Sequence, residues 1–153
     1  MSLSDKSKEN RAIARVALDL CETNVDNQDD SFKITSVGYY NLAANRFYYS
    51  CFQKLLDLAN NKLSYEEESK QSGSSHINLI NFIDMKINDA MKDNKKRMKI
   101  IQGRNIRAPF LELKDYRVIS DYKIENIDQE NIECIKNHVK QFDNYLSIIR
   151  NEL

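Results

Sequence analysis

The sequence predicts an all-α protein, and three observations support this fold class. Only three glycines and one proline occur in 153 residues, fewer than a sandwich or barrel needs for its turns. Apolar residues recur at intervals of three and four, whereas no segment alternates as a strand does. The length suits one domain over 1–153, with its core at about 37–150. We expect an up-and-down bundle of four main helices with an additional N-terminal helix.

The segment from Gly38 to Asn60 is predicted to be the central helix. Leu42, Tyr49 and Phe52 share one face, and a second apolar stripe covers much of the remaining circumference. A helix that is apolar on most sides is usually buried among neighbouring helices. We therefore expect the rest of the chain to pack around this segment.

An N-terminal helix is expected over about 7–23. Its predicted apolar face holds Ile13, Val16, Ala17 and Leu20. The acidic, Asn-rich segment 24–36 has no lasting period and is predicted to be a loop. The segment 61–75 ends in a Ser/Gly run and is the best candidate for mobility.

Three more helices are expected in the second half of the chain. One begins at His76 and runs into a basic stretch, and the next carries Pro109 in its first turn and runs to about Tyr122. The last is capped by Asn126 or Asp128. Its apolar seam consists of Ile132, Ile135, Val139, Phe142, Leu146, Ile149 and Leu153. A seam this regular needs a facing helix along its length, as in a bundle.

The charges are balanced overall but not locally. Lys plus Arg and Asp plus Glu both number 23, so net charge does not indicate a polyanionic partner. The stretch 92–107 nevertheless has seven basic residues against one acidic residue. One interpretation is a solvated helix face, and the other is an RNA-binding surface in which Lys95, Lys96 and Arg97 contact phosphates.

Several kinds of site are not expected. The three cysteines, Cys21, Cys51 and Cys134, lack paired spacing and occupy apolar-periodic positions, so we expect reduced thiols. Neither a Gly-rich phosphate loop nor a Glu-x-x-His pair occurs, so we expect no metal and no cofactor. No stretch is long and uncharged enough to cross a bilayer, and we expect a cytoplasmic protein.

Arg117 is the most informative candidate, because it lies on the apolar face of its predicted helix. A guanidinium there needs partners, and Asp121 is one turn away. One interpretation is a buried ion pair that fixes this helix to the central one. The other is an arginine that faces phosphate or RNA, beside Tyr122.

Three residues elsewhere have a functional and a structural interpretation each. Arg46 and the neighbouring tyrosines are interpreted either as the lining of a cleft or as a surface arginine above aromatic rings that fill the core. His76 is interpreted either as catalytic or as a first-turn residue that contacts backbone or solvent. Cys51 is interpreted either as a nucleophile or as a buried apolar side chain.

The chain resembles the HEPN domain family (higher eukaryotes and prokaryotes nucleotide-binding). The segment 39–58, with the run Asn45-Arg46-Phe47-Tyr48-Tyr49, resembles the Y..A.NRAYYA.F signature of that family. His76 with Phe82 resembles its next helix, and 113–122 resembles its L..LR..ADY segment. The segment 139–149 is similar to its closing helix.

The resemblance implies a helical bundle, commonly a homodimer, often partnered by a minimal nucleotidyltransferase in toxin–antitoxin pairs. Active members are metal-independent RNases with an Arg followed, after four to six intervening residues, by His. Here Tyr122 stands five residues after Arg117, and no Arg precedes His76 or His138 at that spacing. Without a general acid or base the reaction loses about a hundred- to ten-thousand-fold. The resemblance therefore favours a non-nucleolytic binding or accessory protein.

We thus expect a dimeric protein with a nucleotide- or RNA-binding site. The expected site residues are Arg117, Asp121, Tyr122, Arg46, Tyr49, Lys95, Lys96 and Arg97. The first alternative is an RNase toxin using Arg117 with Tyr122 or a displaced His76, and the second is a protein-interaction scaffold. Dimerisation is expected through the Arg117 helix and the central helix, whose aromatic rings exceed what three neighbours easily cover.

Overall fold

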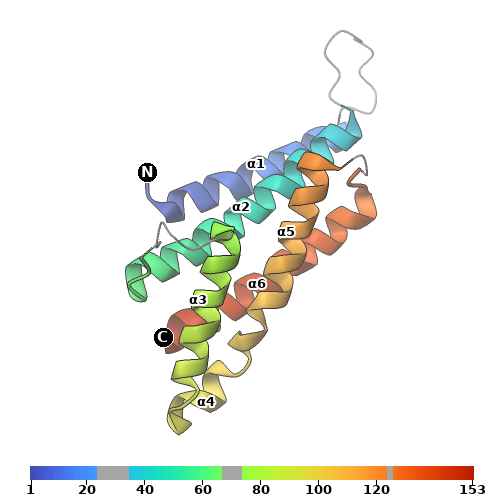
Figure 1. Cartoon of the computed structure of the whole chain (residues 1–153). Coiled ribbons are helices and arrows are strands. Elements are labelled where there is room, and N and C mark those ends of the chain that lie inside the picture. The colour runs from blue at the N-terminus through green and yellow to red at the C-terminus, as the bar shows by residue number, and fades with distance from the viewer. Residues whose placement is uncertain (24–34, 67–73, 124–125) are drawn as a thin grey trace.

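The computed structural model describes residues 1–23, 35–66, 74–123 and 126–153 and is all-α over those ranges, as predicted (Figure 1). The elements are α1 (Leu3–Thr23), α2 (Ser36–Lys62), α3 (Ser75–Ala90), α4 (Asn94–Ile100), the 3₁₀ turn η3 (Gly103–Ile106), α5 (Arg107–Tyr122) and α6 (Gln129–Glu152). Most of the predicted 24–36 loop, and residues 67–73 of the predicted mobile segment, lie outside the described residues.

Helix α2 is the element against which the other long helices pack. Helix α1 lies antiparallel along it, and both α5 and α6 contact it (Figure 1). The predicted central helix falls inside α2, which begins earlier because the Thr35 side chain accepts a hydrogen bond from the Gly38 amide at 3.4 Å. Tyr48, Cys51 and Leu55 are fully buried on this helix. The core extends from α2 into every long helix.

The predicted buried face of α1 is wrong in most of its residues. Ile13, Val16 and Leu20 are exposed, whereas Ala17, at the edge of the predicted face, is buried with residues on a face turned by about 100° around the helix. The buried set consists of Ser7, Asn10, Ala14, Ala17, Leu18 and Cys21. Alanines allow the backbones of α1 and α2 to approach closely, and the buried polar residues find partners on α2. The Ser7 hydroxyl, for example, donates to the Ser50 carbonyl at 2.9 Å.

The last helix has the predicted seam and the predicted cap. All seam residues from Ile132 to Ile149 are buried, and Leu153 is half-buried. At its start the Asp128 carboxylate accepts from the Asn131 amide at 2.8 Å, and the Asn131 side chain accepts from the Asp128 amide at 3.1 Å. This reciprocal capping fixes where α6 begins.

The basic stretch forms a separate short helix, which corrects the prediction that the third helix continues into it. Helix α3 ends at Ala90, and the Asp93 carboxylate accepts from the Lys95 amide at 2.8 Å to cap α4. The turn η3 then packs Gly103 against α6, where an added Cβ would lie 2.7 Å from Ile149 Cγ1. Helix α5 thus starts beside α4 and ends at the opposite side of the molecule (Figure 1).

Candidate functional site

Arg117 lies between two tyrosine rings that come from different helices. Its Cζ is 5.7 Å from the ring centroid of Tyr49 on α2 and 5.1 Å from that of Tyr122 at the end of α5. Its Nη2 donates to the Tyr49 hydroxyl at 3.2 Å and, more weakly, to the Tyr122 hydroxyl at 3.4 Å. These contacts fix the plane of the guanidinium next to two π faces.

Asp121 connects this arginine to the central helix. Arg117 Nε is 2.9 Å from Asp121 Oδ2, an ion pair across one helical turn. The second carboxylate oxygen accepts from Asn45 Nδ2 of α2 at 2.8 Å. The two side chains of the pair are 20% and 26% exposed, so the pair lies at the surface and is not sealed in the core. The pair is therefore only partly buried, and it is joined to α2 through Asn45 and Tyr49.

His76 lies in the first turn of α3, as predicted, and contacts aromatic side chains of α2. Its Nδ1 is 2.6 Å from the Tyr48 hydroxyl, and its ring centroid is 4.3 Å from that of Phe52. Burial raises the pKa of Tyr48, which therefore stays a neutral phenol at physiological pH. The Tyr49 ring lies 6.5 Å from the His76 ring, so Tyr49 borders both His76 and Arg117.

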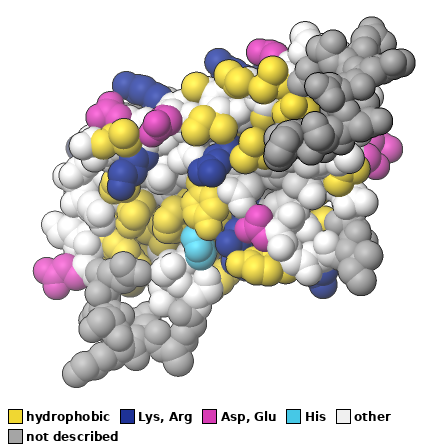
Figure 2. Space-filling view, turned by 90° about the horizontal axis from the view of Figure 1, so that it is seen from above, with side chains coloured by type: hydrophobic (Ala, Val, Ile, Leu, Met, Phe, Trp, Pro, Cys, Tyr) yellow, Lys and Arg dark blue, Asp and Glu magenta, His cyan; other side chains and the backbone are white. Residues whose placement is uncertain are grey.

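We call Tyr49, His76, Arg117, Asp121 and Tyr122 the arginine–tyrosine cluster. Figure 2 shows the face seen from above, with a histidine beside basic and acidic side chains and hydrophobic ones around them. Tyr122 is 71% exposed, an unusual position for so large an aromatic ring. The cluster therefore presents an exposed tyrosine ring to solvent, beside a guanidinium that is only one-fifth exposed.

The other predicted site residues lie elsewhere. Arg46 Nη1 donates to Asn10 Oδ1 of α1 at 3.2 Å, so the recorded partner of this arginine lies on α1 and not in the cluster. Lys95, Lys96 and Arg97 are exposed on α4, whereas Arg117 lies ten residues into α5, about 15 Å along its axis. The basic stretch is therefore a second surface and not part of the cluster.

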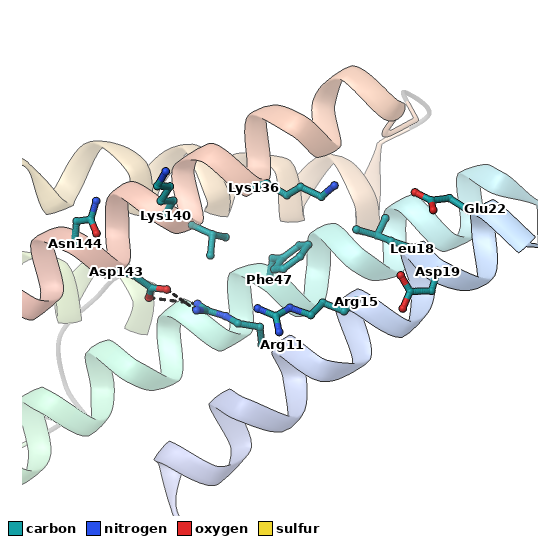
Figure 3. A pocket seen from close by; sticks show the side chains of 11 residues that line it. Arg11, Arg15, Leu18, Asp19, Glu22, Phe47, Lys136, Lys140, Asp143 and Asn144 are labelled. Atoms are coloured by element: carbon teal, nitrogen blue, oxygen red, sulfur yellow. Dashed lines mark hydrogen bonds and ion pairs between the residues drawn. The ribbon is translucent and has the colours of Figure 1, made fainter.

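A groove of about 570 Å³ between α1 and α6 was not predicted from the sequence (Figure 3). We call it the α1–α6 groove, and Phe47 of α2 forms part of its floor. Its lining residues are Arg11, Arg15, Leu18, Asp19, Glu22, Phe47, Lys136, Val139, Lys140, Asp143 and Asn144. Arg11 and Lys136 each have a second basic residue one turn later. That spacing is visible in the sequence, but only the fold shows that the two pairs face one groove.

The described parts of the chain hold no second chemical centre of the usual kinds. Nowhere in them do three His, Cys, Asp or Glu side chains converge as a metal site requires. The three cysteines are free, and burial raises the pKa of the Cys51 thiol to about 12, which fits the apolar interpretation of that residue. None of the described helices has the length and apolar character of a membrane span.

The fold and the cluster define a small helical protein with an arginine–tyrosine surface site. Comparison with protein-family models, with curated proteins and with solved structures found no match to this chain.

Proposed function

We propose that this chain is a HEPN-like bundle protein of the cytoplasm that binds single-stranded RNA at the arginine–tyrosine cluster. The observation that carries the proposal is the exposed ring of Tyr122, held 5.1 Å from the Arg117 guanidinium. Proteins recognise unpaired bases by stacking them on aromatic side chains and on arginine planes, while arginine also contacts phosphate. The order of the motifs along α2, α3, α5 and α6 supports the same family.

A purely structural role explains only part of the cluster. The Arg117–Asp121 pair and the Asn45 hydrogen bond link α5 to α2 without help from Tyr122. A tyrosine that is 71% exposed gains little from folding, since most of its apolar surface stays in water. Base stacking gives this ring a role that helix packing does not.

The test is the affinity for a fluorescein-labelled ten-nucleotide RNA, measured by fluorescence anisotropy. Replacing Tyr122 with Ala removes a stacking surface worth about 1–3 kcal/mol, so the Kd is expected to rise about tenfold or more. A second cluster variant, Arg117→Lys, removes the guanidinium and keeps the charge, and it is also expected to weaken binding. Its matched control is Arg104→Lys on η3, because Arg104 is exposed and lies outside the cluster. Wild-type affinity in both cluster variants contradicts the proposal.

The basic residues of α4 add a separate, salt-dependent contact in this proposal. Lys95, Lys96 and Arg97 are exposed and form no ion pair with other described residues. Their replacement by Gln is expected to reduce the slope of log Kd against log salt by about 2, because each phosphate contact on a single strand contributes about 0.7. If the triple variant binds RNA like wild type at every salt concentration, α4 is only a solvated surface.

A second candidate function, metal-independent RNA cleavage, is favoured by the position of His76. The Tyr48 hydroxyl contacts the imidazole, whose ring lies 6.5 Å from that of Tyr49, and Tyr49 also contacts Arg117. An imidazole and a guanidinium at one site supply acid–base chemistry and phosphate charge stabilisation. Cleavage of the same RNA in EDTA, lost in both His76→Ala and Arg117→Ala, distinguishes this function from binding alone. Growth arrest on expression that Arg117→Ala abolishes is the corresponding result in cells.

Homodimerisation and a nucleotidyltransferase partner remain proposals that follow from the resemblance. The sequence predicts the dimer because the central helix has more aromatic rings than its neighbours within one chain easily cover. Phe47 and Tyr48 are only 5% and 0% exposed within one chain, so this reason is weakened. Light scattering at micromolar concentration measures the dimer directly. If neither RNA nor a second copy of the chain binds, the remaining hypothesis is that the protein is a scaffold for interactions with other proteins.

A further inference from the structure

We propose that the α1–α6 groove binds a phosphate ester of a small, partly apolar molecule. The groove lies outside the arginine–tyrosine cluster. Phe47 in its floor and Tyr49 in the cluster are two residues apart on α2, which places their side chains about 200° apart around the helix. Its volume of about 570 Å³ falls within the range of small-molecule sites.

Cations from both walls supply the recognition of phosphate. Arg15 lies on α1, whereas Lys136 and Lys140 lie on α6, so both helices that form the walls contribute basic residues to the lining (Figure 3). Arg15 and Lys140 form no ion pair with any described residue. Lys136 contacts Glu133 at 2.8 Å, but both side chains are well exposed, at 45% and 63%, so that pair competes weakly with a ligand.

The fourth cation of the groove, Arg11, has a different role. It pairs with Asp143 across the gap between α1 and α6, and Asp143 also accepts from Lys54 at 2.7 Å. This bridge closes one end of the groove and separates it from a smaller cavity of about 340 Å³ on the far side. The groove is therefore closed at the end nearest the start of α1, where a strand would otherwise pass on into the smaller cavity.

The floor of the groove and its other end indicate what the proposed ligand carries besides its phosphate. Leu18, Phe47 and Val139 form an apolar floor on which a ring or short aliphatic group packs. Asp19 and Glu22 lie towards the other end and repel a second phosphate. Their carboxylates instead accept hydrogen bonds from hydroxyl or amino groups. This charge pattern favours one phosphate on a compact body over a nucleic-acid strand.

The experiment follows the methyl resonances of Leu18 and Val139 by NMR while phenyl phosphate is added. We expect saturable shifts of these methyl groups, weaker binding of inorganic phosphate and no comparable shifts with phenol. The double variant Arg15→Gln/Lys140→Gln is expected to lose about tenfold in affinity for each cation removed. Both residues are exposed, so the fold is retained, and unchanged thermal unfolding verifies this.

The matched control is Lys99→Gln/Arg104→Gln, which removes one Lys and one Arg from exposed positions on α4 and η3 and is expected to bind phenyl phosphate like wild type. The proposal is overturned if the shifts map to other residues, or if both double variants bind equally well. Displacement of phenyl phosphate by the ten-nucleotide RNA also overturns it, because the groove then accepts a strand. Failure of RNA binding at Tyr122 leaves this result unaffected.

Discussion

Replacing Asp143 with alanine is expected to destabilise this protein more than the loss of any exposed ion pair. The Asp143 carboxylate on α6 receives Arg11 from α1 and Lys54 from α2, so one residue links three helices. The side chains of Arg11, Lys54 and Asp143 are only 17%, 29% and 31% exposed. Charged hydrogen bonds in such partly buried positions contribute more than surface pairs do.

The magnitude follows from two charge-assisted contacts and from what remains after their loss. Each such hydrogen bond is worth about 1.5–3 kcal/mol when buried, and partial exposure reduces this. The alanine variant also leaves the guanidinium of Arg11 without its carboxylate. We expect a loss of about 2–4 kcal/mol in the free energy of unfolding, or about 5–15 °C in Tm for a chain of this size.

The pH dependence gives the same residue a second signature. Partial burial on its own raises the pKa of Asp143, but the hydrogen bonds and charges of Arg11 and Lys54 outweigh it and lower this pKa. A carboxyl whose pKa is lower in the folded state stabilises above its unfolded pKa of about 3.9. That stabilisation is lost as pH falls through the lowered folded value. The stability difference between wild type and Asp143→Asn is therefore full at pH 7 and shrinks in acid.

Urea unfolding followed by circular dichroism at several pH values measures both effects. Asp89→Ala is the control, because Asp89 and Lys92 form an i,i+3 pair with side chains 55% and 78% exposed. The control is expected to change stability by less than about 0.5 kcal/mol. An Asp143→Ala variant as stable as that control refutes the reasoning, as does a difference for Asp143→Asn that persists unchanged in acid.

Two further substitutions test the packing and the capping. Gly103→Ala places a Cβ 2.7 Å from Cγ1 of the buried Ile149, so overpacking is expected to cost about 1–3 kcal/mol in urea unfolding; a neutral result shows that η3 shifts freely. Asp128→Ala removes half of the capping box of α6 and is expected to cost about 1 kcal/mol, with faster hydrogen exchange confined to the first turn; uniform exchange along α6 contradicts this.

The sequence was most informative where one helix face decides burial by itself. The seam of α6 combines large apolar residues at strict spacing with polar residues elsewhere, so only one orientation buries it. Helix α1 offers two faces, one with Ile13, Val16 and Leu20 and one with alanines. A hydrophobicity argument selects the larger residues. The fold instead buries the alanines, since they permit close helix contact and bring Ser7 against Ser50.

The candidate site divides in the same way between local and long-range information. The Arg117–Asp121 pair follows from i,i+4 spacing, and Tyr122 is its sequence neighbour. The contact of Tyr48 with His76 joins residues 28 positions apart, and that of Asn45 with Asp121 joins residues 76 apart. No periodicity contains such information. The α1–α6 groove escaped prediction for this reason too, because its walls are the first and last helices.

The charge state of the cluster determines which interaction dominates RNA binding in this proposal. Asp121 already neutralises Arg117 at 2.9 Å, so a phosphate must compete with a carboxylate that α2 also holds. The net electrostatic gain from Arg117 is therefore small, and stacking on the exposed Tyr122 ring accounts for most of the affinity at the cluster. The cations of α4 have no such competitor among the described residues, so the salt dependence of binding originates there. In this proposal, bases stack on Tyr122 at the end of α5, and phosphates contact the basic residues of α4, which precedes the start of α5.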